Sequence, residues 1–138
     1  MKGIKRRSDC PISYALDIFG DKWSLLIIRN LMFEHKRTYG EFLKSGEKIS
    51  TNILADRLAM LECAGLLKSR KDEENRSKKI YFLTDKAIEL LPAILEIVYW
   101  SAKHDKQTAA PKQFIQRIKN DKEGLIKELA AFLKSTQK

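Results

Sequence analysis

One helix and the segment after it constrain the fold more than any other part of the sequence. Ser50 is suited to cap a helix that runs to about residue 64, and Gly65 stands where a left-handed residue would end it. Residues 66–83 then have strand-like apolar content at both ends and a wholly polar middle, 72–78. The pattern predicts a helix followed directly by a two-stranded hairpin with a long, charged tip.

The two faces of this helix differ in character. At 100° per residue, its apolar residues gather on one side, which we expect to face a core. That side comprises Ile53, Leu54, Arg57, Leu58, Leu61 and Ala64. The opposite side consists mainly of small residues: Asn52, Ala55, Asp56, Ala59 and Cys63. A solvated face usually carries long charged side chains, so the small side chains indicate a face that something approaches closely.

Helices are predicted on both sides of this unit. Pro11 suits the first turn of a helix that ends at Gly20, and an apolar stripe marks a second helix over residues 23–31. Thr38 is a candidate N-cap for a short helix closed by Gly46. Three helices followed by a hairpin is the order of elements in a winged helix-turn-helix. In that fold the third helix, here the one over residues 50–64, enters the major groove of DNA.

Two further helical segments follow the hairpin. Thr84 is predicted to cap a long helix to about residue 103, with Pro92 as a kink inside it. Residues 112–134 carry a broad apolar stripe. The fold class is therefore mostly α with a small β-hairpin, divided into a DNA-binding domain over residues 10–84 and a helical dimerisation extension over residues 85–138.

Composition narrows the functional classes. The chain has 138 residues and a formal net charge of +9, which favours an anionic partner, either a nucleic acid or a membrane surface. Two cysteines and two histidines, without ligand spacing, predict neither a disulfide scaffold nor a zinc site. The sequence has no apolar run long enough to span a membrane, and residues 1–9 lack the apolar stretch of a secretion signal. We expect a cytoplasmic protein without metal or cofactor.

The sequence gives little support for catalysis. No histidine lies near a serine or cysteine in a recognisable arrangement, and the chain has no glycine-rich phosphate loop. We therefore expect a binding protein and not an enzyme.

Short peptides in a fixed order reveal a family resemblance over about residues 10–100. In chain order they are Cys10-Pro11, Gly20-Asp21-Lys22-Trp23, Ile49-Ser50-Thr51-Asn52-Ile53-Leu54, Leu58-Ala59-Met60-Leu61-Glu62, Gly65-Leu66-Leu67 and Tyr81-Phe82-Leu83-Thr84. Together they resemble the HxlR family of bacterial MarR-like transcription regulators. The sequence departs from that family at the hairpin tip, which has no proline, and after Thr84, where Lys86 and Ala87 replace the usual glycine.

The resemblance turns the start of the 50–64 helix into a candidate DNA contact. A capped helix whose polar start faces water is the simpler interpretation, but backbone N–H groups at a helix start also favour phosphate. Asn52 is the best candidate for reading a base, because an amide can pair bidentately with adenine. The full set of predicted contacts on this helix is Ser50, Thr51, Asn52, Ala55 and Asp56.

Basic residues beside this helix are predicted to contact the DNA backbone. The hairpin carries six cations against three acids, which a solvated loop could also explain. Arg70, Arg76 and Lys78 are the candidates on the hairpin, with Lys36 and Arg37 as weaker ones ahead of the short helix.

The helix predicted over residues 85–103 carries more apolar surface than one face can hold, so it must be buried nearly all round. One interpretation is a homodimer interface formed by Leu91, Ile94, Val98 and Trp100. The other is that residues 112–134 fold back and cover the surplus within one subunit, and both can hold together. A two-fold dimer would bind double-stranded DNA with an inverted repeat.

Cys10 is a candidate redox sensor. Because it precedes Pro11, its sulfur would lie by the free N–H groups of a helix start, where the dipole favours a thiolate. Several members of the resembling family use a cysteine at this place as a redox or electrophile switch. The alternative is a small, half-buried residue that packs the N-terminus onto the dimer and has no chemical role. Cys63 is expected to pack as a small hydrophobe.

The sequence thus predicts a sequence-specific, homodimeric DNA-binding regulator. We expect it to act as a repressor and to respond to thiol oxidation or electrophiles through Cys10. The rival is a basic module that binds a protein or a membrane surface through the C-terminal helix. That segment, from residue 103 onward, carries nine Lys or Arg against four Asp or Glu.

Overall fold

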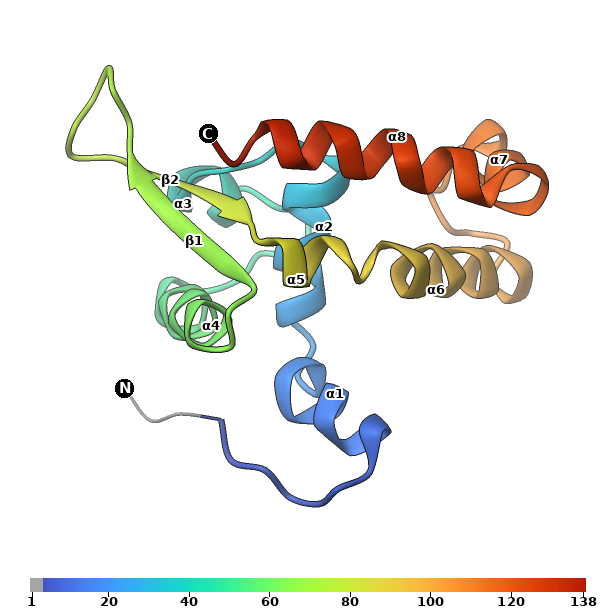
Figure 1. Ribbon diagram of the computed structural model, residues 1–138, viewed down its shortest axis with the longest axis horizontal. Coiled ribbons are helices and arrows are strands. Elements are labelled where there is room, and N and C mark those ends of the chain that lie inside the picture. The colour runs from blue at the N-terminus through green and yellow to red at the C-terminus, as the bar shows by residue number, and fades with distance from the viewer. Residues whose placement is uncertain (1–3) are drawn as a thin grey trace.

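The computed structural model describes residues 4–138. A two-stranded hairpin lies between the fourth helix and the last one, and its tip projects away from the helices (Figure 1). In chain order the elements are α1 (Pro11–Phe19), α2 (Ser24–Phe33), α3 (Tyr39–Leu43), α4 (Thr51–Cys63), β1 (Leu67–Lys71), β2 (Lys79–Leu83), α5 (Asp85–Ile88), α6 (Leu91–His104), α7 (Lys112–Asn120) and α8 (Lys122–Ser135). The mostly helical fold with a small hairpin is a winged helix, as the sequence predicts.

Local capping signals account for the first helices. Pro11 occupies the first turn of α1, where its missing N–H costs no hydrogen bond. Asp21 fixes the start of α2: its carboxylate accepts hydrogen bonds from the backbone N–H groups of Trp23 and Ser24, both at 2.9 Å, and from the Ser24 hydroxyl. The Gly20-Asp21-Lys22-Trp23 peptide is therefore the corner between α1 and α2.

The helix-turn-helix pair begins at two hydroxyl caps. Thr38 and Glu41 form a reciprocal capping box at the start of α3. The Ser50 hydroxyl accepts from the backbone N–H of Ile53, which starts α4 at the predicted residue. Gly65 follows the end of α4 with a φ of +79°, a conformation that residues with a Cβ rarely adopt. The 50–65 prediction is confirmed.

The hairpin is an antiparallel pair in which Leu67 is opposite Leu83 and Arg70 is opposite Ile80. The tip of the hairpin forms without a proline, because local hydrogen bonds to two side chains stabilise its turns. The Asp72 carboxylate accepts from the N–H of Glu74, and the Asn75 side chain accepts from the N–H and hydroxyl of Ser77.

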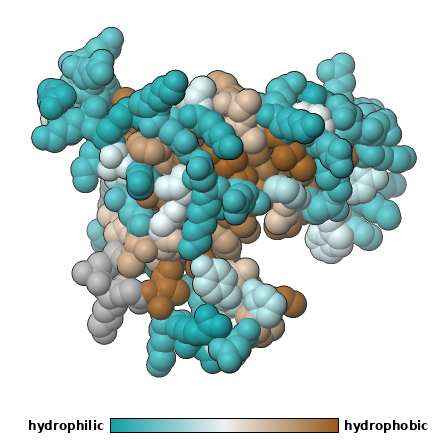
Figure 2. All heavy atoms as spheres, viewed as in Figure 1, coloured by the Kyte–Doolittle hydropathy of each residue, from teal (hydrophilic) through white to brown (hydrophobic). Residues whose placement is uncertain are grey.

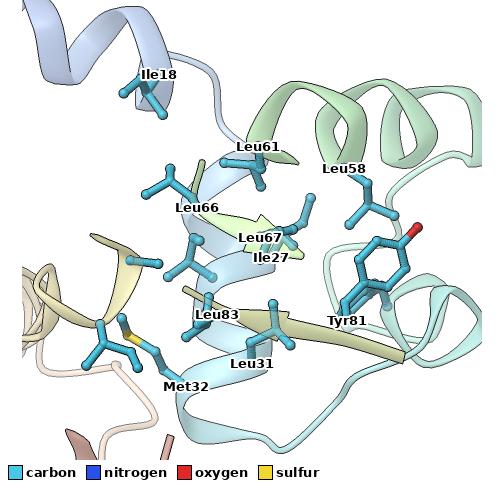
Figure 3. Close-up of a cluster of buried hydrophobic side chains, with 14 of the residues drawn as sticks. Ile18, Ile27, Leu31, Met32, Leu58, Leu61, Leu66, Leu67, Tyr81 and Leu83 are labelled. Atoms are coloured by element: carbon cyan, nitrogen blue, oxygen red, sulfur yellow. The ribbon is translucent and has the colours of Figure 1, made fainter. Parts of the chain in front are cut away.

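The core lies where α2, α4 and the hairpin meet. Figure 3 shows Leu58 and Leu61 of α4 pointing toward the strands and α2, and Tyr81 and Leu83 of β2 lie in the same cluster. Ile27 and Leu31 contribute the buried face of α2. Burying aliphatic side chains of this size stabilises a fold by about 1.5–3 kcal/mol each. This cluster therefore fixes α4 against the hairpin.

The two long helices predicted after the hairpin are each divided. The helix predicted over residues 85–103 breaks after α5, and Pro92 lies in the first turn of α6, where it begins a helix instead of kinking one. The stretch predicted over residues 112–134 breaks at Asp121, whose side chain accepts from the N–H of Gly124 and caps α8. The prediction of continuous helices was wrong at both places.

The C-terminal helices fold back onto the rest of the subunit. Leu95 of α6, Ile118 of α7 and Leu125 of α8 form a second buried cluster, and Leu133 joins the main core. Helix α8 also packs against α5 and β2. The interpretation that residues 112–134 cover surplus apolar surface within one subunit is thus confirmed.

Candidate nucleic-acid interface

The N-terminal end of α4 forms an exposed, polar surface. Ser50, Thr51 and Asn52 are all exposed there, and so are Ala55 and Asp56 one turn later. Tyr39 of α3 donates its hydroxyl hydrogen to the Thr51 carbonyl at 3.0 Å, which ties α3 to the start of α4. The predicted contact residues on α4 therefore share one accessible face.

The buried side of α4 agrees with the prediction at its three leucines. Leu54, Leu58 and Leu61 are buried, but Ile53 is 39% exposed and adds an apolar side chain to the accessible face. Successive residues of a helix leave it about 100° apart, so Ile53 and Leu54 can differ in burial although both lie in the first turn.

Asp56 and Arg57 form an ion pair on this helix, and Arg57 also lies 3.4 Å from Asp21. The hydrogen bond to Asp56 raises the pKa of Arg57 despite its partial burial, and the charge of Asp21 adds to the rise. Arg57 therefore joins α4 to the corner that starts α2. Asp56 has a cationic partner in the subunit, which reduces its repulsion of a nearby phosphate.

The hairpin tip supplies cations beside this surface. Arg76 and Lys78 are exposed, and Figure 2 shows hydrophilic residues covering the tip. The positive charge of Lys78 contributes to lowering the pKa of Glu41, after the larger effect of the hydrogen bond from the Arg37 N–H. Lys78 is thus near the start of α3, on the helix-turn-helix side of the hairpin.

Three predicted phosphate contacts have other partners. Arg37 and Arg70 both donate to the carbonyl of Thr136 at the C-terminal end of α8, at 3.3 and 3.1 Å. Lys36 forms an ion pair with Glu34 at 3.0 Å. Sequence spacing could not reveal this, because the partner of Arg70 lies 66 residues away. All five basic residues stay predicted phosphate contacts; Arg76 and Lys78 are the exposed ones on the hairpin.

The residues predicted for the dimer interface differ in exposure. Leu91 and Ile94 pack in the core of the subunit, at 0% and 8% exposure, so they are not available to a second copy. Val98 is half-buried against both clusters, whereas Trp100 is 64% exposed. Ile97, which the sequence analysis did not single out, is exposed on the same helix.

Helix α1 adds a second exposed apolar surface, which the sequence analysis did not single out. Its Ile12 and Leu16 are 70% and 51% exposed. Helical spacing alone gives the face of a helix but not its partner, so these residues could not be separated from core residues in advance.

Cys10 is the N-cap residue of α1 and is exposed. Its side chain makes no capping hydrogen bond. The nearby cations are engaged: Arg6 pairs with Asp9 and Arg7 with Asp17. Cys63 is also exposed, so the expectation that it packs as a hydrophobe was wrong.

Residues 4–138 contain no group of three or more His, Cys, Asp or Glu side chains placed to hold a metal ion. No helix within this described part is both long and apolar enough to cross a bilayer.

Known proteins share this architecture and much of the sequence. Residues 18–109 match the HxlR-like helix-turn-helix family. An uncharacterized HTH-type transcriptional regulator of Halalkalibacterium halodurans is 33% identical over 101 residues, covering 73% of this chain and 89% of that protein. The HTH-type transcriptional regulator YdeP of Bacillus subtilis, also uncharacterized, is 33% identical over 118 residues, covering 80% and 91%.

Two solved structures extend the comparison. The reduced form of the transcriptional regulator YodB from B. subtilis has a TM-score of 0.58 at 28% identity, covering 73% of this chain and 99% of that one. The redox regulator HypR in its oxidized form has a TM-score of 0.60 at 26% identity, covering 68% and 96%. With the exposed start of α4 flanked by a basic hairpin, these matches lead to one conclusion: the chain belongs to the HxlR-like helix-turn-helix family of transcriptional regulators.

Proposed function

We propose that this chain is a homodimeric, sequence-specific DNA-binding repressor that recognises an inverted-repeat operator. The observation that carries the proposal is the accessible start of α4 beside the basic hairpin tip. Residues 10–84 would form the DNA-binding domain, and residues 85–138 the dimerisation extension.

In this arrangement α4 enters the major groove. Asn52 reads a base edge, while Ser50 and Thr51 contact phosphate at the helix start, where backbone N–H groups point outward. The small side chain of Ala55 allows close approach, and Arg76 and Lys78 neutralise backbone phosphates.

A second copy would bind across the exposed apolar residues of α6 and α1. Ile97 and Trp100 replace Leu91 and Ile94 as its central contacts, with Val98 at the edge. Two recognition helices related by a two-fold axis then require half-sites about one helical turn, roughly 10 bp, apart or a multiple of it.

Cys10 is proposed as the residue through which thiol oxidation or an electrophile changes DNA binding. Its exposure makes the sulfur accessible, and the two redox-related neighbours YodB and HypR support this role by likeness. Because α1 forms part of the proposed dimer surface, modification there would alter the spacing of the two recognition helices.

The deciding experiment is selection of bound sequences from a random DNA pool, followed by affinity measurements over a range of salt concentrations. The proposal requires an enriched inverted repeat and an affinity for it that falls steeply with salt. A parallel assay with anionic vesicles tests the rival basic module. Binding to vesicles without enrichment of any DNA sequence would favour the rival and contradict the proposal.

A further inference from the structure

Two arginines converge on a single carbonyl oxygen at the end of α8. Arg37 Nη2 and Arg70 Nη1 donate to Thr136 O at 3.3 and 3.1 Å. Neither guanidinium forms an ion pair with a carboxylate of residues 4–138. The C-terminal end of a helix carries only about half a negative charge, so the carbonyl leaves most of two positive charges uncompensated.

Arg37 has further unsatisfied capacity. Its Nε–H is buried and has no hydrogen-bond partner within residues 4–138. Burial lowers the pKa of Arg37, and the neighbouring charge of Arg70 lowers it further, while Glu41 offsets only part of this effect. A buried donor left unsatisfied destabilises the fold, so the Arg37 side chain is incompletely satisfied within the subunit.

A cavity lies beside these groups. It has a volume of about 470 Å³, within the range typical of small-molecule sites. Its walls come from α2, β2, α8 and the segment between α2 and α3, and they are mainly apolar. The lining includes Leu31, Phe82, Phe132, Leu133, His35 and Arg37. The rings of His35 and Phe132 meet edge to face at the border, 4.9 Å apart between centroids.

We propose that this cavity binds a small organic carboxylate with an aromatic or short aliphatic body. The carboxylate would accept from the Arg37 guanidinium, and the apolar body would fill the space between Phe82, Phe132 and Leu133. An inorganic anion would satisfy the charge but leave the apolar walls empty. A neutral molecule of the same shape would fill the walls but leave the guanidinium without a counter-charge.

DNA is not the occupant that this geometry favours. Helix α8 packs against β2, on the other side of the hairpin from α4, so the cavity does not open toward the proposed recognition helix (Figure 1). Three cavity residues, Phe132, Leu133 and Thr136, lie at or beyond the end of α8 and outside the region 18–109 shared with the HxlR-like family.

The cavity also connects α8 to the hairpin. Tyr81, Phe82 and Leu83 of β2 line it from one side, and the Tyr81 N–H donates to the Arg37 carbonyl at 2.8 Å. If the proposed DNA-binding function holds, a ligand that changes the Arg37–Thr136 contact will also change DNA affinity, and DNA will change ligand affinity by the same factor. This consequence rests on the proposed function, whereas ligand binding itself does not.

The test is an NMR titration of the full chain, without DNA, with sodium benzoate and sodium hexanoate as probes. Benzamide and inorganic phosphate serve as controls for charge and for the apolar body. Arg37→Gln removes the proposed counter-charge, and Arg76→Gln is the matched control, because Arg76 is exposed at the hairpin tip. Phe132→Ala, at a partly exposed position, tests the apolar wall without depending on the folding of the Arg37 variant.

We expect saturable binding of both carboxylates, with shifts at residues lining the cavity. Arg37→Gln should weaken it by about tenfold or more, as expected for loss of one charge-assisted hydrogen bond, and Arg76→Gln should not. Phe132→Ala should weaken benzoate but not phosphate. Three outcomes would each overturn the proposal. Benzamide could bind as tightly as benzoate, or phosphate could bind as tightly as benzoate, which would indicate an adventitious ion only. The third outcome is that benzoate binding does not saturate in the millimolar range. Benzoate binding that leaves DNA affinity unchanged would retain the site and refute only the coupling.

Discussion

The Thr84 hydroxyl donates a hydrogen bond to the Gly65 carbonyl at 2.6 Å and so joins the end of the hairpin to the end of α4. The Thr84 N–H donates to the Leu66 carbonyl at 3.1 Å, and its hydroxyl oxygen accepts from the N–H of Ala87. One residue thus closes the hairpin, caps α5 and fixes the proposed recognition helix relative to the hairpin. The glycine that follows α4 and the threonine that follows β2 are therefore in direct contact.

Replacing Thr84 by alanine should lower the free energy of unfolding by about 1–2 kcal/mol, because an N-cap and a second hydrogen bond are both lost. Urea unfolding measures the change. Thr108→Ala is the control, since the Thr108 side chain makes no hydrogen bond within residues 4–138. Equal stability of the two variants would contradict the joining role of Thr84.

Asp21 should make the stability dependent on pH. Burial raises its pKa, but hydrogen bonds from the Ser24 side chain and from the Trp23 and Ser24 N–H groups outweigh that effect, so its pKa lies below the ordinary 3.8. A carboxyl group with a depressed folded pKa contributes its stability above the unfolded pKa and loses it as pH falls through the folded pKa.

The stability difference between wild type and Asp21→Asn should therefore be constant from neutral pH to about pH 5 and shrink below pH 4. Urea midpoints across this range would reveal it. Asp9→Asn provides the comparison, because the Asp9 side chain is 98% exposed and, within residues 4–138, its only ion pair is with the exposed Arg6. A difference that grows on acidification would contradict the assignment.

Asn52 and Arg76 should affect DNA binding in different ways. Asn52→Ala should reduce the preference for the selected operator over other sequences by roughly 1–3 kcal/mol, because a base contact is lost. Arg76→Ala should weaken all sequences about equally and reduce the salt slope by about 1, since only a phosphate contact is lost. Fluorescence anisotropy with operator and scrambled duplexes separates the two. An unchanged sequence preference in Asn52→Ala would show that α4 is not the reading helix.

Charge introduced at the exposed apolar surface of α6 should prevent assembly. Ile97→Glu and Trp100→Glu should yield monomers in sedimentation at micromolar concentration, because a buried, unpaired carboxylate is costly in an interface. Operator affinity should fall as well, since two linked half-sites bind more tightly than one. Phe132→Glu, on the partly exposed surface of α8, should leave the oligomeric state unchanged. A monomeric wild type would refute the homodimer proposal directly.

Oxidation should act through Cys10. Treatment with a thiol oxidant or a quinone should lower the operator affinity of the wild type and of Cys63→Ser, while Cys10→Ser should keep its affinity. Dithiothreitol should restore the wild type if the product is a disulfide. Because Cys63 is also exposed, it is the matched control. Should Cys10→Ser lose affinity as the wild type does, Cys10 is not the sensor.

The sequence alone located the elements whose signals are local. Ser50, Thr38 and Thr84 cap helices where they were expected to, and Gly65 adopts the left-handed conformation. A cap or a positive φ depends on neighbours within about four residues, so it can be recognised from the sequence. The exposed start of α4 was predicted on the same basis.

The partners of side chains across the fold were decided only by the tertiary structure. Arg37 and Arg70 looked like phosphate contacts, but α8 folds back so that Thr136, 99 and 66 residues away, accepts from them. An apolar helix stripe likewise does not say what covers it: Leu91 is buried within the subunit, while Trp100 on the same helix is exposed. Periodicity fixes the direction in which a side chain leaves its helix. What it then meets depends on how distant segments pack, which is why the cavity beneath α8 could not be predicted from the sequence.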